Sequence, residues 1–224
     1  METITKKDQE EKKSPKTMVK GAEAVIMSLL EEGVDTVFGY PGGAIMPIYD
    51  EMPGYEDKLK HILVRHEQGG AHAAQSYAQV TGKVGVCFAT SGPGATNLIT
   101  GIANASIDSI PMVFVTAQVP SPLLGTDAFK ETDVVGLTMP ITKWNFQITK
   151  ASEIPGAFAK AFYLANTGRK GVVVLDITKD AQLEEVPFHY EKFPVVRSYA
   201  PLPTLNKEKV KEAADLINQS KKPY

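Results

Sequence analysis

The chain has 224 residues, of which 43% are hydrophobic and 22% are charged, an ordinary composition for a globular protein. Its 24 lysines and arginines are balanced by 26 acidic residues, which gives a net charge of -2. The chain therefore lacks the excess of positive charge that is typical of proteins that bind nucleic acids or anionic membranes. The single cysteine, Cys87, excludes an intramolecular disulfide framework and a multi-cysteine zinc site. It fits a reducing compartment, and we expect a cytoplasmic protein that does not bind membranes or nucleic acid.

Residues 1–16 mix lysines with acidic residues and contain no apolar segment, which favours a solvated, disordered tail over a targeting peptide. From residue 17 the pattern alternates between helices and short apolar strands. A first helix ends at Gly33, a short one ends near residue 52, one over 66–81 ends at Gly82, and one covers 95–106. A later helix has Ser152 as its expected N-cap, Pro155 in its first turn and Gly168 at its end. Strands are predicted over 36–38, 61–64, 84–89, 112–115, 144–149 and 172–177.

Short apolar strands that alternate with helices predict an α/β fold, a parallel sheet with helices on both faces, over residues 17–181. Ligands of such sheets bind beyond the carboxyl ends of the strands. Residues 182–205 are rich in proline and are expected to form a linker. Asn206 then caps an amphipathic helix, so residues 206–224 are expected to begin a truncated second domain of a longer protein.

Three features at predicted strand ends are candidate binding elements, and local sequence leaves the role of each open. Glu67 opens the helix over 66–81, where a carboxylate either caps the helix or shares a proton with a ligand nitrogen. The glycine-rich loop over 90–94 matches neither common phosphate-binding motif, and local evidence favours a tight turn between a strand and a helix over a ligand loop. The loop over 40–44 has the same ambiguity. The four histidines show no metal-ligand spacing, and Cys87 lies in an apolar strand as an expected core residue.

Taken together, five segments closely resemble the catalytic subunits of the acetolactate synthase (acetohydroxyacid synthase) family of thiamine-diphosphate-dependent enzymes. Arg65-His66-Glu67-Gln68 and Thr90-Ser91-Gly92-Pro93-Gly94 mark the wider superfamily, and Gly125-Thr126-Asp127-Ala128-Phe129 narrows the resemblance to acetolactate synthase. The other segments are Phe38-Gly39-Tyr40-Pro41-Gly42-Gly43-Ala44 and Gln118-Val119-Pro120. The resemblance implies the fold of the family's pyrimidine-binding domain, followed by the entry to its middle, FAD-associated domain.

The resemblance also implies roles for single residues. Glu67 matches the glutamate that activates the cofactor by hydrogen bonding to its pyrimidine nitrogen, and Gly43 matches a loop beside the reacting centre. Arg169 matches an FAD contact. The substrate pocket and its channel are expected to include the following residues: Phe129, Lys130, Lys179, Pro120 and Ala44.

The implied reaction is decarboxylation of pyruvate and ligation to a second 2-keto acid, which gives 2-acetolactate or 2-aceto-2-hydroxybutyrate in valine, leucine and isoleucine biosynthesis. The implied cofactors are thiamine diphosphate, Mg²⁺ and FAD. The family's Gly-Asp-Gly motif for diphosphate and Mg²⁺ does not occur in this sequence, so we expect no metal ligand within it. The family also implies a homodimer with a shared cofactor site and a small regulatory subunit.

Alternatives remain at this stage. Another thiamine-diphosphate enzyme, of the pyruvate oxidase or sulfoacetaldehyde acetyltransferase type, would share most of these motifs. A non-catalytic dimerising fragment and a nucleotide-binding domain without catalysis are two further interpretations. Three departures from the family pattern bear on substrate choice and on the channel: Lys130 where glutamine is usual, Ser121-Pro122 where basic residues are usual, and the segment over 72–79.

Overall fold

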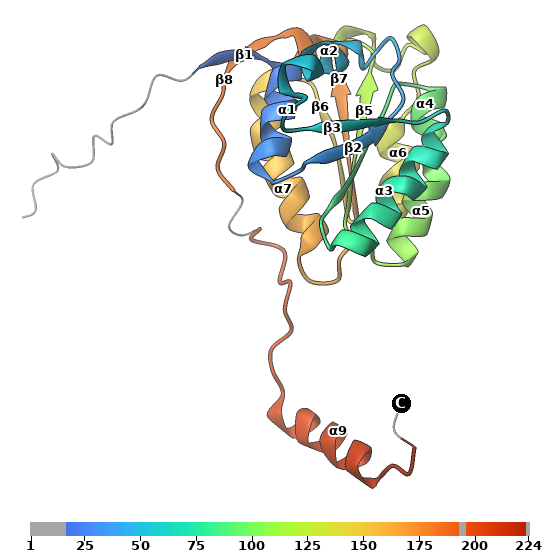
Figure 1. The fold of residues 1–224 in the computed structure, drawn as a ribbon, viewed down its shortest axis with the longest axis vertical. Coiled ribbons are helices and arrows are strands. Elements are labelled where there is room, and N and C mark those ends of the chain that lie inside the picture. Colours follow the sequence, from blue (N-terminus) through green and yellow to red (C-terminus); the bar gives the residue numbers. More distant parts are fainter. Residues whose placement is uncertain (1–16, 193–195, 223–224) are drawn as a thin grey trace, which may run out of the picture.

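A six-stranded parallel sheet forms the centre of the protein in the computed structural model, which describes residues 17–192 and 196–222 (Figure 1). The tail expected over 1–16 lies outside these residues. The strand order is β3-β2-β4-β5-β7-β6, and every neighbouring pair is parallel. The strands are β2 (Thr36–Gly39), β3 (Lys60–Leu63), β4 (Gly85–Ala89), β5 (Met112–Gln118), β6 (Trp144–Ile148) and β7 (Val172–Thr178). The predicted fold class is confirmed.

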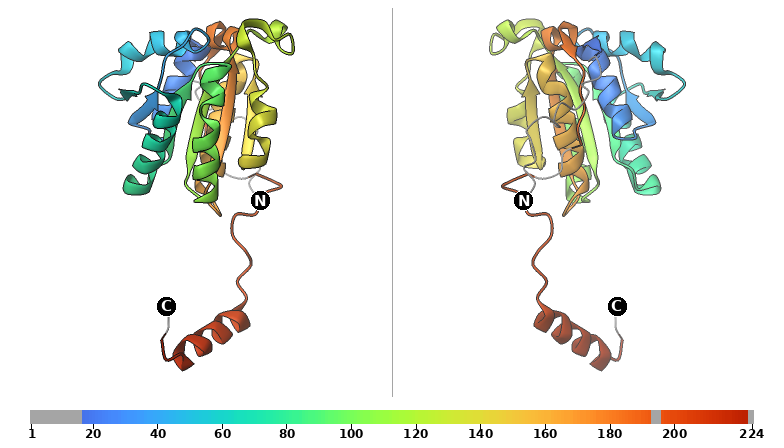
Figure 2. Two further views of the ribbon diagram at one scale, coloured as in Figure 1. Left: turned by 90° about the vertical axis from the view of Figure 1, so that its right-hand side faces the viewer. Right: turned by 90° about the vertical axis from the view of Figure 1, so that its left-hand side faces the viewer.

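Helices cover both faces of the sheet, as the views in Figure 2 show. One face packs against α1 (Gly21–Glu31), α2 (Met46–Glu51), α7 (Ile154–Asn166) and α8 (Lys179–Leu183). The other packs against α3 (Glu67–Thr81), α5 (Ile99–Ile107) and α6 (Val134–Thr138). The sheet separates two hydrophobic cores, one on each face. Consecutive residues of β4 show this, because Phe88 packs in the core beside α1 and Cys87 packs in the core beside α3. Within the described residues no helix has the length and apolar character needed to cross a membrane.

Glycine ends two of the helices where the sequence predicts it. Gly82 caps α3 with a φ of 73° and donates its N–H to the carbonyl of Ala78, and Gly33 follows α1 with a φ of 76°. The left-handed conformation costs glycine little, because it has no Cβ. Both predicted helix ends are confirmed.

Two predicted helices differ in detail from the observed ones. The expected helix over 95–106 is two helices, α4 (Pro93–Thr96) and α5, with Asn97 and Leu98 at the junction. The expectation that Ser152 is the N-cap of α7 is wrong, because a 3₁₀ turn (Ala151–Glu153) precedes this helix. Instead the Glu153 carboxylate accepts the N–H groups of residues 149 and 150, and Pro155 lies in the first turn as predicted.

Two elements at the ends of the domain were not predicted. β1 (Met18–Lys20) pairs antiparallel with β8 (Glu185–Pro187), and Gln182 of α8 is fully buried. The segment expected as a linker over 182–205 therefore begins inside the packed structure, which continues to residue 187. Asn206 caps α9 (Lys207–Gln219) by accepting the N–H of Lys209, as predicted, and α9 lies apart from the sheet domain (Figure 1).

Lys143, just before β6, joins the end of α7 to the segment that follows β8. Its Nζ donates to the carbonyl oxygens of Leu164, Thr167 (2.9 Å) and Arg169 (2.8 Å), and to the hydroxyl of Tyr199 (3.0 Å). The Tyr199 hydroxyl donates in turn to the Thr167 carbonyl at 2.7 Å. A cation among the last carbonyls of a helix is electrostatically favourable. This cluster fixes the chain to the sheet domain as far as residue 199.

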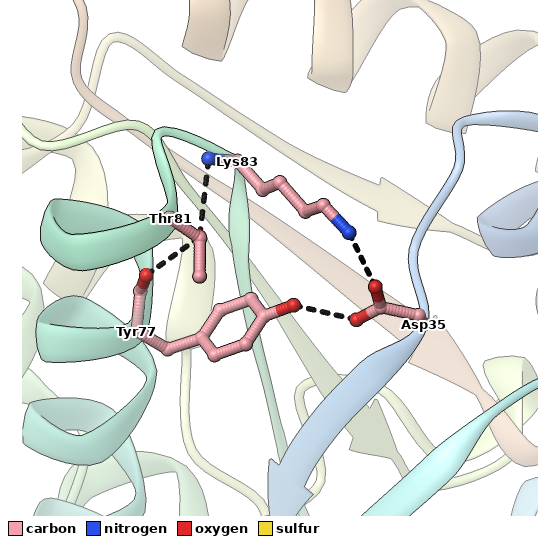
Figure 3. A network of polar contacts seen from close by, with 4 residues as sticks. All are labelled: Asp35, Tyr77, Thr81 and Lys83. Carbon is pink, nitrogen blue, oxygen red and sulfur yellow. Dashed lines mark hydrogen bonds and ion pairs between the residues drawn. The ribbon is translucent and has the colours of Figure 1, made fainter.

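A polar network ties the start of β2 to the end of α3 (Figure 3). The Asp35 carboxylate accepts hydrogen bonds from the Tyr77 hydroxyl (2.5 Å) and from the Lys83 ammonium. Thr81 completes the network, because its hydroxyl donates to the Tyr77 carbonyl at 2.7 Å and accepts the Lys83 N–H at 3.3 Å. Hydrogen bonds from Lys83 and Tyr77 lower the pKa of Asp35 to about 2.

This network predicts acid sensitivity. Because the folded-state pKa of Asp35 lies below its usual value, its contribution to stability is present above about pH 4 and is lost as pH falls toward 2. Asp35→Asn should therefore flatten the fall in thermal unfolding midpoint between pH 4 and 2. The effect should be small and should shrink in high salt, because the ion pair is about half exposed.

The control is Asp57→Asn, an exposed carboxylate that accepts no side-chain hydrogen bond within the described residues. Its unfolding profile should follow that of the wild type. Equal slopes for Asp35→Asn and the wild type would show that the network does not stabilise the fold through charge.

Candidate active site

Glu67 occupies the N-terminal end of α3, directly after β3. The helix is capped by the side chain of His66, whose Nδ1 accepts the N–H of Gln68 at 3.2 Å. The interpretation of Glu67 as the helix cap is therefore wrong. Its side chain is 7% exposed and lies in the first turn, where the helix dipole favours a negative charge.

The Glu67 carboxylate is held on one side only. Asn97, at the junction of α4 and α5, donates its side-chain amide to Oε2 at 2.8 Å. The other oxygen, Oε1, accepts no hydrogen bond from the described residues, and it lies 3.2 Å from the point where a Cβ on Gly94 would stand. A buried carboxylate with no cation partner in the described part of the chain fits a group that shares a proton with a ligand nitrogen.

The loop over 40–44 packs directly against Thr90 at the end of β4. The Thr90 hydroxyl accepts the N–H of Ala44 at 3.2 Å, and a Cβ on Gly42 would lie 2.5 Å from the Thr90 side chain. A Cβ on Gly94 would meet the same side chain at 2.7 Å. Glycine is therefore required on both sides of Thr90, and the two glycine-rich loops lie side by side next to Glu67.

Residues from the far half of the chain complete this cluster. Lys179, at the start of α8, donates its ammonium to the carbonyl of Gly43 at 3.2 Å, and Gln182 donates to the carbonyl of Ala44 at 3.1 Å. The Phe129 ring lies 3.6 Å from the point where a Cβ on Gly43 would stand. Four predicted site residues, Gly43, Ala44, Phe129 and Lys179, thus meet at the carboxyl edge of the sheet.

The loop that carries Phe129 has an unusual backbone. Phe129 and Lys130 have positive φ values of 49° and 61°, a strained conformation for residues with a Cβ, and Phe129 is 75% exposed. The Glu131 carboxylate holds the preceding turn by accepting three backbone N–H groups, those of residues 125, 126 and 127, at 2.7, 3.0 and 3.1 Å. At Gly92 the loop approaches so closely that a Cβ would lie 2.2 Å from the Lys130 carbonyl oxygen.

The position of Pro120 is set by its neighbour. Ser121 donates its N–H to Asp180 Oδ1 at 2.9 Å and its hydroxyl to the other oxygen of the same carboxylate. Asp180 directly follows Lys179. Pro120 therefore lies at the same edge of the sheet as the Gly43 cluster.

A buried polar network that was not predicted lies beneath this loop. Asp176 of β7 is fully buried and accepts hydrogen bonds from Thr116 (2.6 Å), Gln118 (3.3 Å) and Gln147 (3.1 Å). Gln118 also donates to the carbonyl of Thr132 at 2.9 Å, which ties the loop to the sheet. Burial raises the pKa of Asp176 despite these bonds. The available signal was an acidic residue within an otherwise apolar strand.

Two other titratable side chains, Tyr49 and Cys87, sense the charge of Glu67, and His61 contacts Tyr49. Burial raises the pKa of the Tyr49 phenol and of the Cys87 thiol, and the negative charge of Glu67 adds to both shifts. Burial lowers the pKa of His61, whose Nε2 lies 3.3 Å from the Tyr49 hydroxyl. All three side chains are therefore neutral at pH 7. Cys87 is a core residue, as predicted.

Arg169 lies away from these residues. It precedes β7, whereas Lys179 follows the same strand, so the two side chains start from opposite edges of the sheet. The Arg169 guanidinium donates to the Ser109 hydroxyl at 2.8 Å and to the Ile107 carbonyl at 3.4 Å. The predicted FAD contact is therefore not part of the Glu67 cluster.

The arrangement fits one half of a thiamine cofactor. Glu67 has a free carboxylate oxygen beside two closely packed glycine loops, which suits a ring nitrogen and a flat heterocycle. Within the described residues, no three histidine, cysteine or acidic side chains are grouped so that they could hold a metal ion. The unbound Glu67 oxygen and the close glycine loops are the features that fit the pyrimidine part of the cofactor.

Comparisons with known proteins agree with this fit. Residues 19–137, more than half of the chain, match the family described as thiamine pyrophosphate enzyme, N-terminal TPP binding domain. Similar curated proteins include the acetolactate synthase large subunit of Corynebacterium glutamicum, 54% identical over 204 residues, which cover 91% of this chain and 32% of that protein. The probable acetolactate synthase large subunit of Methanocaldococcus jannaschii is 51% identical over 210 residues, covering 92% of this chain and 35% of that protein.

A third relative, the acetolactate synthase large subunit of Parasynechococcus marenigrum, is 51% identical over 217 residues, which cover 94% of this chain and 34% of that protein. The chain thus spans about one third of the length of these curated relatives. The resemblance found in the sequence is confirmed by their names. Because the family match covers more than half of it, the chain belongs to the thiamine pyrophosphate enzyme family and contains the N-terminal TPP-binding domain of that family.

Proposed function

We propose that this chain is the pyrimidine-binding part of an acetolactate synthase. The whole protein would decarboxylate pyruvate and join the remaining two-carbon unit to a second 2-keto acid, giving 2-acetolactate or 2-aceto-2-hydroxybutyrate for valine, leucine and isoleucine synthesis. The observation that carries the proposal is the buried Glu67 carboxylate, with one oxygen bound to Asn97 and the other free beside the glycine loops. The names of the relatives support the choice of reaction.

Each residue of the cluster has a distinct task in this proposal. When bound, thiamine diphosphate supplies the electron sink that decarboxylation of a 2-keto acid requires. Glu67 holds and exchanges a proton at the pyrimidine nitrogen. Gly43 lets the backbone approach the reacting atoms, and Phe129 forms an apolar wall of the acceptor pocket. Lys179 holds the Gly43 carbonyl and places a positive charge at the pocket entrance.

Further parts of the proposal concern the whole protein. Mg²⁺ and the diphosphate would bind outside this chain, FAD would contact Arg169, and a second subunit would complete the cofactor site. The term large subunit in the relatives' names supports a small regulatory partner. Pro120, Ala44 and Lys130 would border the substrate channel in a cytoplasmic enzyme.

The first test of this function is Glu67→Gln in the full-length holoenzyme. Glutamine is nearly isosteric and keeps the packing, but it cannot exchange a proton with the pyrimidine nitrogen. Hydrogen–deuterium exchange at the thiazolium C2, measured by proton NMR after acid quench, should slow by about 10²–10⁴-fold.

Glu23→Gln is the matched control, because Glu23 also lies in the first turn of a helix and accepts a hydrogen bond, from Tyr55 at 2.7 Å. This variant should lose some stability and keep the wild-type exchange rate. An unchanged exchange rate in Glu67→Gln would remove Glu67 from the catalytic machinery.

The second test concerns the 224-residue chain by itself. It should bind thiamine diphosphate weakly and show no carboligase activity, because phosphate anchoring should supply much of the binding free energy and is expected from another part of the protein. Calorimetric titration with cofactor and Mg²⁺ measures this directly. Tight, saturable binding would contradict the assignment of the diphosphate site to a region outside the chain.

The third test is Phe129→Ala in the full-length enzyme. Loss of one aromatic wall should change the ratio of the products formed with pyruvate and with 2-ketobutyrate as acceptors. The expected change in differential transition-state binding free energy is about 1–3 kcal/mol. Val80→Ala, an exposed apolar position near the opposite end of α3, should leave the ratio unchanged. An unaltered ratio in Phe129→Ala would exclude this ring from the acceptor pocket. Formation of acetate or acetyl phosphate by the wild-type enzyme would identify a different reaction.

A further inference from the structure

The bond between Asn97 and Glu67 joins two elements that are distant in sequence. Asn97 is half-buried and donates to Oε2 at 2.8 Å, and no other side chain within the described residues donates a hydrogen bond to this carboxylate. Oε2 therefore has one hydrogen-bond donor in place. Oε1, on the side of Gly94, has no donor among the described residues and is open to a ligand nitrogen.

The backbone leaves Asn97 little freedom to move. Its N–H donates to the Pro93 carbonyl at 3.1 Å, which closes α4. Four residues after Asn97, α5 packs so closely on α3 that a Cβ on Gly101 would lie 2.3 Å from the Cβ of Ala71. Ala71 is one turn beyond Glu67 on α3, so the helix contact itself sets the distance between the two side chains.

The other titratable groups around Glu67 do not compete for this role. Tyr49 from α2 and Cys87 from β4 both sense its charge, but burial keeps each neutral, and neither forms a hydrogen bond to it. The adjacent side chains of Arg65 and His66 are exposed. Asn97 is thus the side chain that determines how the carboxylate is oriented.

We propose that Asn97 is a positioning residue that fixes the Glu67 carboxylate through Oε2 and so directs proton exchange to Oε1. This proposal rests on the function assigned to Glu67 above. An asparagine suits the task, because its amide donates a proton to a carboxylate without itself titrating. It stabilises the charged form of Glu67 while it limits rotation of the group.

The first experiment compares Asn97→Leu with Asn104→Leu in the full-length holoenzyme. Asn104 is a matched control, since it also lies in the α4–α5 segment and donates its amide to a side chain of α3, Gln75, at the same distance of 2.8 Å. Asn97→Leu should slow C2 exchange by about tenfold to a hundredfold, as expected for a misplaced catalytic group. Asn104→Leu should lose stability and keep the exchange rate.

The second experiment needs no cofactor. In the 224-residue chain labelled with ¹³C-glutamate, the side-chain carboxyl signal of Glu67 is followed against pH. Its titration midpoint should move to higher pH in Asn97→Leu, because the charged form loses a donor, and further in Asn97→Asp, which places a second carboxylate beside it. Asn104→Leu should leave the midpoint where it is in the wild type.

The outcomes separate this inference from the proposed function. Wild-type exchange and an unmoved midpoint in Asn97→Leu, with slow exchange in Glu67→Gln, would overturn the role of Asn97 alone. Rapid exchange in both variants would overturn the function assigned to Glu67 as well. Equal effects of Asn97→Leu and Asn104→Leu would reduce the contact to general support of the helix pair.

Discussion

Parallel pairing of β4 with β2 on one side and β5 on the other is the constraint on which the site depends. Phe38 is paired with Cys87, and Ala89 with Thr116, so the segments that leave these strands emerge together at one edge. Close packing reinforces this register, because a Cβ on Gly39 would lie 2.8 Å from that of Phe88. A shift of one residue along β2 would turn its core side chains to the opposite face and separate the two glycine loops.

The buried Asp176 network adds a second level of support. Three side-chain donors on β5 and β6 offset the cost of removing this carboxylate from water. Through Gln118 the same network reaches the backbone of Thr132, close to the strained turn at Phe129. A loop with positive φ values at bulky residues persists only when its surroundings determine it, and here the sheet and the Glu131 carboxylate do so together.

Much of the fold was predictable because its signals are local. Apolar runs of strand length between helical segments identified every strand of the main sheet, and Gly33 and Gly82 marked true helix ends. β1 and β8 were missed because three-residue strands carry no periodicity and exist only through their mutual pairing. Serine is a common cap by residue type, which favours Ser152, but the longer Glu153 side chain reaches back to the free N–H groups of the turn.

The residues of the candidate site could be predicted from the sequence, but most of the contacts between them could not. Glu67, Gly43 and Phe129 were predicted from motifs, and the structure gathers Gly43 and Phe129 with Lys179 around the loop that adjoins Glu67. The contact of Asn97 was not predicted, because an amide 30 residues from its carboxylate gives no local signal. The site therefore depends on helix packing that no short motif encodes.

The Lys143 cluster sets the geometry of everything that follows the sheet domain. It anchors the chain at Tyr199, beside the end of α7 and at the amino edge of the sheet, so the tether to α9 starts on the side remote from Glu67. Seven residues separate Tyr199 from Lys207, and such a span reaches at most about 29 Å. α9 therefore begins within that distance of the amino edge of the sheet. Glu67 and the two glycine loops lie at the opposite, carboxyl edge, so the connection to α9 leaves the domain on the side away from them.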